Sequence, residues 1–229
     1  MTKYRAIICT SKSWLPNEYY HSLIRECELF FITKKADLYS EVINKYRPNY
    51  IFFPHWSYII PKEIYENSNC VIFHMTDLPF GRGGSPLQNL IKRKIKKTRI
   101  SAIKCISELD AGPIFLKKDL DLTGSAQEIY MRASKIIVDM IKEIITNNIQ
   151  PTAQVGEVVN FERRKPSQSE MSDINNLEDL YDHIRMLDAN GYPKAYINRE
   201  GINYQFSNAK FSDDGVLHAQ VELRVSHDS

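Results

Sequence analysis

Hydrophobic and polar residues follow two different periods over the first 120 residues of the chain. Short apolar runs rich in β-branched and aromatic side chains, which are typical of buried strands, occur at 4–10 (YRAIICT), 28–33 (ELFFIT), 50–53 (YIFF), 70–74 (CVIFH) and 99–108 (RISAIKCISE). Segments with helical spacing lie between them, and in one of these Leu38, Val42, Ile43 and Tyr46 share a helix face. This alternation predicts an α/β fold with a doubly wound, mostly parallel sheet.

Two helices are predicted after the strand at 70–74. Pro86 occupies the first position of an expected helix over 86–97, where a missing N–H is tolerated. Ser125 and the glutamate three residues later form a capping box for the strongest helical pattern, residues 125–147.

The composition changes after residue 151. A basic, proline-interrupted connector precedes a short predicted helix, NLEDLYDHIRML, which we expect to end near Asn190-Gly191. Alternating residues with turns at 199–201 and 213–215 then predict a small β-meander. We therefore expect a catalytic α/β domain over residues 1–165 and a small helix-plus-β-hairpin subdomain over residues 166–229.

Composition and charge narrow the class of protein. The chain is 43% hydrophobic and 25% charged, which is ordinary for a folded protein, and 30 basic against 28 acidic residues leave a net charge of +2. A balance this neutral argues against a dedicated binder of nucleic acid or of a membrane surface. The four cysteines have no metal-ligand spacing, so we expect reduced, buried thiols, a cytoplasmic location and no metal.

The strand at 70–74 leads into the most informative loop, HMTDLPFGRGGSPLQNLI. His74 ends a predicted parallel strand, which is where open α/β sheets place their ligands. Glycines at 81, 83 and 84 allow backbone N–H groups to approach a ligand, and Arg82 adds a planar cation. A surface turn with one buried histidine explains the same residues. The glycine order does not match a dinucleotide or P-loop fingerprint.

A second polar turn, ELDAGPI, follows the next predicted strand and places Asp110 36 residues after His74. A carboxylate at a neighbouring strand end can orient an imidazole and stabilise its charge. Aspartates are also common in ordinary turns, so spacing alone leaves both explanations open.

Several linked elements of this region resemble the 10-formyltetrahydrofolate-dependent formyltransferases. Members of that family carry a Leu-Pro-x-x-Arg-Gly-x-x-Pro loop after a histidine, and an Asp-x-Gly turn about 36 residues later. This sequence supplies His74, LPFGRGGSP at 78–86, and Asp110 with Gly112. The family usually carries asparagine two positions before the histidine; here that position is Ile72. We expect another donor to replace it, with the Gly83-Gly84 backbone, Thr76 and Asn89 as candidates.

The resemblance implies a Rossmann-like formyltransferase fold and a set of site residues. His74 and Asp110 are the implied catalytic residues, and no metal is needed for the formyl transfer. Trp56, Thr76 and Asn89 are the candidates for contact with the acceptor amine. The implied binding residues for 10-formyltetrahydrofolate, the co-substrate, are Phe80, Gly81, Arg82, Gly83, Gly84, Ser85, Leu87, Leu109 and Asp110.

The acceptor is the least constrained part of the interpretation. The sequence of the loop looks most like that of enzymes that formylate a nucleotide-linked, UDP-linked 4-amino-4,6-dideoxy sugar of the pseudaminic-acid pathway. We therefore expect a nucleotide-sugar partner, and neither a nucleic-acid nor a membrane partner. The alternatives are methionyl-tRNA and a peptide-synthetase aminoacyl group. An apolar patch on the subdomain could form a homodimer interface.

A further alternative is a non-catalytic module that binds a polyanion or folate. Its best support is the run KRKIKKTR at 92–99, which has six basic residues in eight positions. A solvated helix face explains the run as well, because Leu90, Ile91 and Ile95 have helical spacing.

Overall fold

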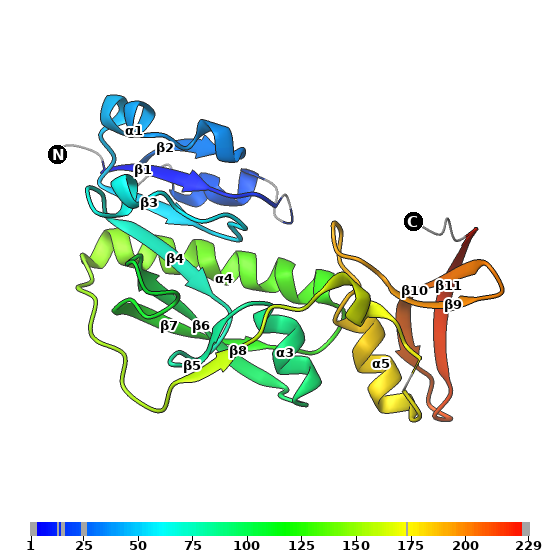
Figure 1. Cartoon of the computed structure of the whole chain (residues 1–229). Coiled ribbons are helices and arrows are strands. Elements are labelled where there is room, and N and C mark those ends of the chain that lie inside the picture. The colour runs from blue at the N-terminus through cyan, green and yellow to red at the C-terminus, as the bar shows by residue number, and fades with distance from the viewer. Residues whose placement is uncertain (1–3, 13, 15–16, 24–26, 173, 226–229) are drawn as a thin grey trace. The chain divides into compact units, whose positions relative to one another are not determined.

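A six-stranded mixed sheet is the centre of the fold (Figure 1). The computed structural model describes residues 4–12, 14, 17–23, 27–172 and 174–225. Four strands are mutually parallel in the order β2-β1-β3-β4, and β6 continues the sheet antiparallel to β4, with β7 at the edge. Their bounds are β1 Tyr4–Cys9, β2 Cys27–Ile32, β3 Tyr50–Phe53, β4 Cys70–His74, β6 Lys97–Lys104 and β7 Ile114–Asp121. The predicted α/β class and the mostly parallel sheet are confirmed.

The middle strands are buried on both faces, which explains their almost continuous apolar sequences. Ile7, Ile51 and Val71, from β1, β3 and β4, have no exposed surface. All four cysteines are buried thiols, and burial raises the pKa of the Cys105 thiol to about 11. Buried thiols of this kind are unreactive packing groups.

Helices follow most of these strands along the chain. Ser125 and Glu128 make the expected reciprocal cap: the Ser125 N–H donates to the Glu128 carboxylate over 2.8 Å, and the Glu128 N–H donates to Ser125 Oγ over 3.3 Å. The α-helices are α1 Ser40–Tyr46, α2 Lys62–Tyr65, α3 Pro86–Lys92, α4 Ala126–Asn147 and α5 Leu177–Arg185, and the 3-10 helices are η1 Asn17–Leu23, η2 Lys35–Asp37 and η3 Pro166–Ser169.

Two short sheets complete the secondary structure. β5 Phe80–Gly83 pairs with β8 Val159–Phe161, so part of the glycine-rich segment is a strand. The β-meander is confirmed as an antiparallel sheet in the order β11-β10-β9, made of β9 Ala195–Arg199, β10 Ile202–Phe211 and β11 Leu217–Val225.

The chain forms two compact units, each built from separated segments. The first unit contains Met1–Gly83, Thr98–Leu120 and Met131–Asn160, and the second contains Gly84–Lys97, Asp121–Tyr130 and Phe161–Ser229. The sheet strands β1 to β4 belong to the first unit, and α3, α5 and the three-stranded sheet belong to the second. The division into domains at 165/166 stays a prediction about folding.

Two predicted helices end earlier than expected. α3 stops at Lys92 instead of continuing to 97, because Lys94 has a left-handed backbone (φ 59°) and β6 begins at Lys97. The basic run at 92–99 is therefore a helix end, a turn and a strand start, not one helix face. α5 ends at Arg185, before the predicted cap at Asn190-Gly191.

Candidate active site

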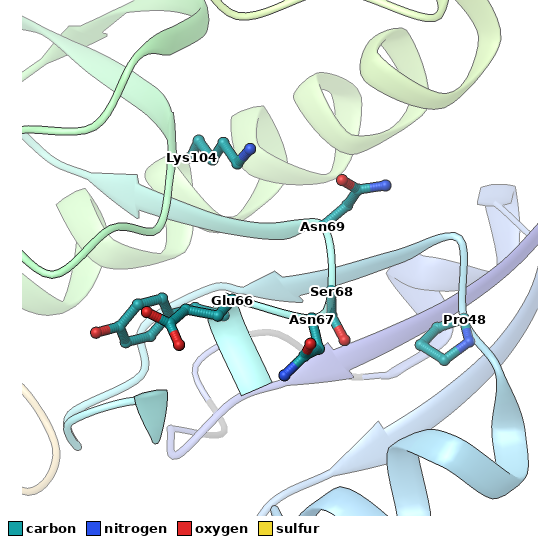
Figure 2. A pocket seen from close by; sticks show the side chains of 7 residues that line it. Pro48, Glu66, Asn67, Ser68, Asn69 and Lys104 are labelled. Carbon is teal, nitrogen blue, oxygen red and sulfur yellow. The ribbon is translucent and has the colours of Figure 1, made fainter. Parts of the chain in front are cut away.

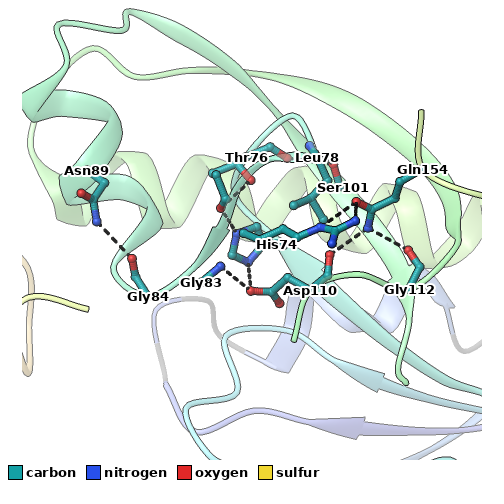
Figure 3. Close-up of polar contacts among 12 residues, drawn as sticks. His74, Thr76, Leu78, Gly83, Gly84, Asn89, Ser101, Asp110, Gly112 and Gln154 are labelled. Atoms are coloured by element: carbon teal, nitrogen blue, oxygen red, sulfur yellow. Dashed lines mark hydrogen bonds and ion pairs between the residues drawn. The ribbon is translucent and has the colours of Figure 1, made fainter. Parts of the chain in front are cut away.

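His74 is the last residue of β4, and its side chain is almost fully buried (7% exposed) between two oxygen atoms. Its Nε2 lies 2.8 Å from the carbonyl oxygen of Gly81, and its Nδ1 lies 3.5 Å from Asp110 Oδ2. A carbonyl oxygen only accepts hydrogen bonds, so Nε2 carries a hydrogen. An ionised carboxylate also only accepts. The His74 ring is held between the Gly81 carbonyl and the Asp110 carboxylate (Figure 3).

Asp110 reaches His74 by a route that strand order alone does not predict. β6 is antiparallel to β4, so Lys104, its last residue, lies opposite Val71 near the start of β4. Residues 105–110 must then run back toward the end of β4. Asp110 completes this path with a left-handed backbone (φ 52°), and its Oδ2 accepts the Gly83 N–H over 2.9 Å. The expectation of two adjacent strand ends is wrong, but the predicted pair forms.

Gly112 allows the connection between β6 and β7 to lie against β6. A Cβ at this position would stand 1.8 Å from the carbonyl oxygen of Lys104, a distance that no side chain tolerates. The Lys104 N–H also donates to the carbonyl of Pro113 over 2.8 Å. Glycine is therefore required here for a close backbone approach.

Arg82 and Gln154 also hold the connection between β6 and β7 in place. Gln154 Nε2 donates to the carbonyl oxygens of Asp110 (2.8 Å) and Gly112 (2.9 Å). Arg82 donates to Gln154 Oε1 through Nε (3.2 Å) and Nη2 (2.9 Å), and its Nη1 pairs with Glu108 at 3.1 Å. Arg82 was predicted as a cofactor-binding residue, but its guanidinium is engaged within the chain. Gln154 belongs to no recognisable motif, so it was not identified as a site residue from the sequence.

The first candidate to replace the family asparagine is already engaged. Thr76 is fully buried, and its hydroxyl donates to the Gly81 carbonyl over 3.2 Å. Ile72 itself is partly buried and packs against the apolar cluster of the sheet. Neither side chain provides a free hydrogen-bond donor beside His74.

Asn89 is engaged as well, within the second unit. Its Nδ2 lies 2.9 Å from the Glu162 carbonyl and 3.1 Å from the carbonyls of Gly84 and Ser85, and its Oδ1 accepts from Arg93 over 3.0 Å. The amide therefore holds the start of α3 in place.

The backbone candidates are occupied too. The Gly83 N–H donates to Asp110, and the Gly84 N–H donates to the Phe161 carbonyl over 3.1 Å. All of the donors proposed in place of the asparagine thus bond within the chain. His74 Nε2 is engaged in the same way, with the Gly81 carbonyl at 2.8 Å, so a substrate oxygen would have to displace one of these internal hydrogen bonds.

The other predicted site residues differ in how much of their side chains is exposed. Leu109 is 71% exposed beside Asp110 in the first unit, and Phe80 is partly buried in β5. Leu87 in the second unit has no exposed surface, so it is a core residue and cannot cover a ligand as expected. Ser85 accepts the Arg164 N–H over 3.0 Å. Trp56 packs edge-on against Phe53, with ring centroids 6.0 Å apart.

A separate hollow of about 290 Å³ lies near the start of β4 (Figure 2). Polar residues of the turn before β4, together with Pro48, Tyr65 and Lys104, line it. Lys104 lies at this side because β6 runs antiparallel to β4. None of the predicted site residues contributes to this hollow.

The described part of the chain has neither a membrane-spanning helix nor a cluster of metal-ligating side chains. Among its helices, none combines the length and apolar character needed to span a bilayer. Within the same residues, no three His, Cys, Asp or Glu side chains gather as metal ligands do.

Comparison with known proteins gives the site its family. A family model described as the C-terminal domain of methionyl-tRNA formyltransferase matches residues 166–224. A structure titled "Methionyl-tRNA formyltransferase from Clostridium thermocellum" is 52% identical, covers 97% of this chain and 100% of its own, and superposes with a TM-score of 0.93. The chain belongs to the formyltransferase family. The resemblance inferred from the loop and the DAG turn is thereby confirmed at family level.

Other proteins that match this chain share less of its sequence. The curated methionyl-tRNA formyltransferase of Bacillus subtilis is 28% identical over 166 residues, or 69% of this chain. The chain spans only 52% of that relative's length. A sugar N-formyltransferase from Shewanella sp FDAARGOS_354 is 15% identical with a TM-score of 0.65, covers 99% of both chains, and shows the fold alone. HypX from Aquifex aeolicus, solved with tetrahydrofolic acid, is 18% identical with a TM-score of 0.75, covering 91% of this chain and 38% of its own.

Proposed function

We propose that this chain transfers a formyl group from 10-formyltetrahydrofolate to the amine of methionyl-tRNA. The observation that carries the proposal is the 52% identity, over nearly the whole of both chains, to a structure named as a methionyl-tRNA formyltransferase. The C-terminal family model and the Bacillus subtilis relative carry the same name.

This assignment reverses the ranking of acceptors made from the sequence. The sugar N-formyltransferase shares only 15% identity, which supports the fold but not a nucleotide-sugar acceptor. The expected absence of a nucleic-acid partner gives way to tRNA for the same reason. Net charge misled here, because affinity for phosphates depends on local rather than total charge. Lys92, Lys96 and Lys97 are all exposed, and they offer such a local concentration.

The His74–Asp110 pair supports formyl transfer chemically. 10-Formyltetrahydrofolate supplies the formyl carbon. As the acceptor nitrogen bonds to that carbon, the formyl oxygen gains negative charge, and a ring N–H of an imidazole is a suitable hydrogen-bond donor to it. The Nε2 hydrogen of His74, which bonds to the Gly81 carbonyl in the structure, turns to that oxygen, while Asp110 orients the ring from its Nδ1 side. The bond to N10 then breaks, and the proton lost by the amine is transferred to N10.

The surface beside this pair suits a flat, partly apolar ligand. Leu109 is 71% exposed and Val155 is 88% exposed, and they adjoin Asp110 and Gln154, whose backbone and side chain hydrogen-bond to each other. Exposed apolar side chains next to a polar catalytic pair are the usual composition of a small-molecule site. We assign folate binding to this part of the first unit.

The test is an acceptor panel with the purified chain and 10-formyltetrahydrofolate. Methionyl-tRNA, uncharged tRNA and nucleotide-linked 4-amino-4,6-dideoxy sugars are compared, with His74→Ala as the inactive control. We expect formyl-methionyl-tRNA and tetrahydrofolate in equal amounts, and neither product with the variant. Turnover of a nucleotide sugar alone would overturn the acceptor, and no turnover with any amine would overturn the activity.

A further inference from the structure

We propose that Gln154 is a positioning residue for the formyl transfer: it fixes the backbone of Asp110 so that the carboxylate faces His74. This inference rests on the function proposed above. It concerns a residue that neither the motifs nor the comparisons single out, 44 positions after Asp110 in the sequence.

The first argument is that Asp110 needs external support. Its left-handed backbone (φ 52°) is a conformation that residues other than glycine adopt infrequently. The hydrogen bond that closes its own turn, from the Ala111 N–H to the Glu108 carbonyl, is long at 3.4 Å. Local sequence therefore does not hold Asp110 in the conformation that the pair with His74 requires.

The second argument is that Gln154 supplies this support directly. Both hydrogens of its amide are used, one on the Asp110 carbonyl at 2.8 Å and one on the Gly112 carbonyl at 2.9 Å, so it bridges the residues on either side of Ala111 (Figure 3). Carbonyls aimed at one amide group cannot rotate independently. The backbone of the turn is thereby fixed at two points.

The third argument is that Gln154 is itself anchored. Its Oε1 accepts two hydrogen bonds from Arg82, whose side chain is only 14% exposed and also pairs with Glu108. The segment that carries Gln154 is attached to β7 by reciprocal backbone bonds between Thr152 and Ile114, at 2.9 and 2.7 Å. An amide held this firmly can impose its geometry on the turn.

Together, Arg82 and Gln154 position Asp110. Arg82 orients the amide, and the amide orients Asp110, whose Oδ2 is held in addition by the Gly83 N–H. The carboxylate is thus fixed through its backbone and through one oxygen. Misplacement of a catalytic group by about 1 Å can cost on the order of 10²-fold in rate, so this support matters for turnover more than for binding.

The experiment compares two near-isosteric variants of Gln154, which distinguish the role of the amide NH2 group from the role of the amide oxygen. Gln154→Glu keeps an oxygen for Arg82 but removes both donors to the turn, and Gln154→Met removes both functions. Gln150→Glu is the matched control, because Gln150 is exposed, lies four residues earlier and undergoes the same charge change.

We expect both Gln154 variants to lower kcat about 10²-fold with KM for 10-formyltetrahydrofolate unchanged, and Gln150→Glu to behave as wild type. Wild-type kcat in Gln154→Glu would overturn the proposal, as would a loss explained entirely by unfolding in a thermal melt.

A measurement without turnover separates this inference from the proposed function. In chains labelled with ¹⁵N-histidine, the ring nitrogen resonances of His74, assigned by His74→Ala, report on the carboxylate facing Nδ1. We expect them to change in both Gln154 variants and to stay unchanged in Gln150→Glu. Unchanged resonances in folded Gln154 variants would overturn the positioning role even if no acceptor were turned over.

Discussion

Two reverse turns of this chain are built in opposite ways. The turn between β9 and β10 is local: Glu200 (φ 50°) and Gly201 (φ 74°) have the left-handed backbone that a tight hairpin needs, and nothing lies within 4 Å of where a Gly201 Cβ would be. The connection between β6 and β7 also contains a left-handed residue, Asp110, but it depends on contacts from Gln154 and Gly83.

The difference explains why only one of these turns can carry chemistry. A local turn needs no partner, so its side chains remain solvated. The connection at 105–113 is folded over the sheet, which leaves Asp110 only 9% exposed and within 3.5 Å of His74. Burial makes the charge of a group more effective and its placement more dependent on its neighbours. Substitutions in the two turns should therefore have different effects: those in the connection at 105–113 should lower kcat, and those in the local turn should change only the free energy of unfolding.

The largest effect is expected at the carboxylate itself. Asp110→Asn keeps an acceptor for the Gly83 N–H but removes the charge that faces His74. We expect kcat to fall on the order of 10²–10³-fold with little change in the free energy of unfolding, measured by formyl transfer and by urea denaturation. Asp214→Asn, in an exposed turn of the three-stranded sheet, is the control. A fall of less than tenfold would contradict the assigned role.

Gly112→Ala should come next, and it affects both stability and activity. The new Cβ would stand 1.8 Å from the Lys104 carbonyl, so the connection must move away from β6. We expect a loss of about 3 kcal/mol in the free energy of unfolding, together with a lower kcat in the molecules that fold. Urea denaturation and turnover per folded molecule measure the two parts. A variant as stable as wild type would show that the close approach is unnecessary.

The turn after β3 has a left-handed residue, as the other two turns do, and the side chain of that residue is partly shielded from solvent, as in the connection between β6 and β7. The stability of this turn should therefore depend on pH. His55 has a left-handed backbone (φ 51°), its Nε2 lies 2.7 Å from Ser134 Oγ, and burial lowers its pKa from 6.5 to about 4. The unfolded chain therefore binds a proton below pH 6.5 that the native chain does not bind until about pH 4. This histidine's contribution is fully present above pH 6.5 and is lost as the pH falls toward 4.

We expect His55→Gln to weaken that pH dependence by about 2 kcal/mol between pH 7 and pH 4.5, measured by urea denaturation at both values. His218→Gln is the matched control, because His218 is exposed on β11. Equal pH dependence in the His55 variant and wild type would mean that the native chain does not lower the pKa of His55.

The smallest effect is expected in the local turn. Gly201→Ala places a side chain where there is space but where φ is 74°, so only backbone strain opposes it. We expect a loss of about 1 kcal/mol in the free energy of unfolding and no change in kcat. Compared with Gly112→Ala, this variant separates conformational strain from steric conflict. A loss as large as that of Gly112→Ala would remove the distinction between the two turns.

The regular elements were accessible from the sequence because their signals are local. The apolar runs predicted β1, β3 and β4 closely, and the Ser125–Glu128 cap marked the start of α4. The α3 boundary was missed because Ile95 has helical spacing but follows Lys94, whose left-handed backbone no periodicity reports. The acceptor ranked first from the sequence is not supported by the comparisons, which favour the alternative, because a short loop records the family more reliably than the substrate.

What the sequence by itself determined was the set of strands β1 to β4, the helix α4, and the presence of a histidine and an aspartate at the spacing of the family. These follow from residue periods and short motifs, which act over a few residues. Only the tertiary structure decided that β6 is antiparallel, that 105–110 runs back to His74, and that Gln154 and Arg82 hold the turn there. Those contacts join residues 27 to 72 positions apart, and their geometry exists only once the sheet has formed.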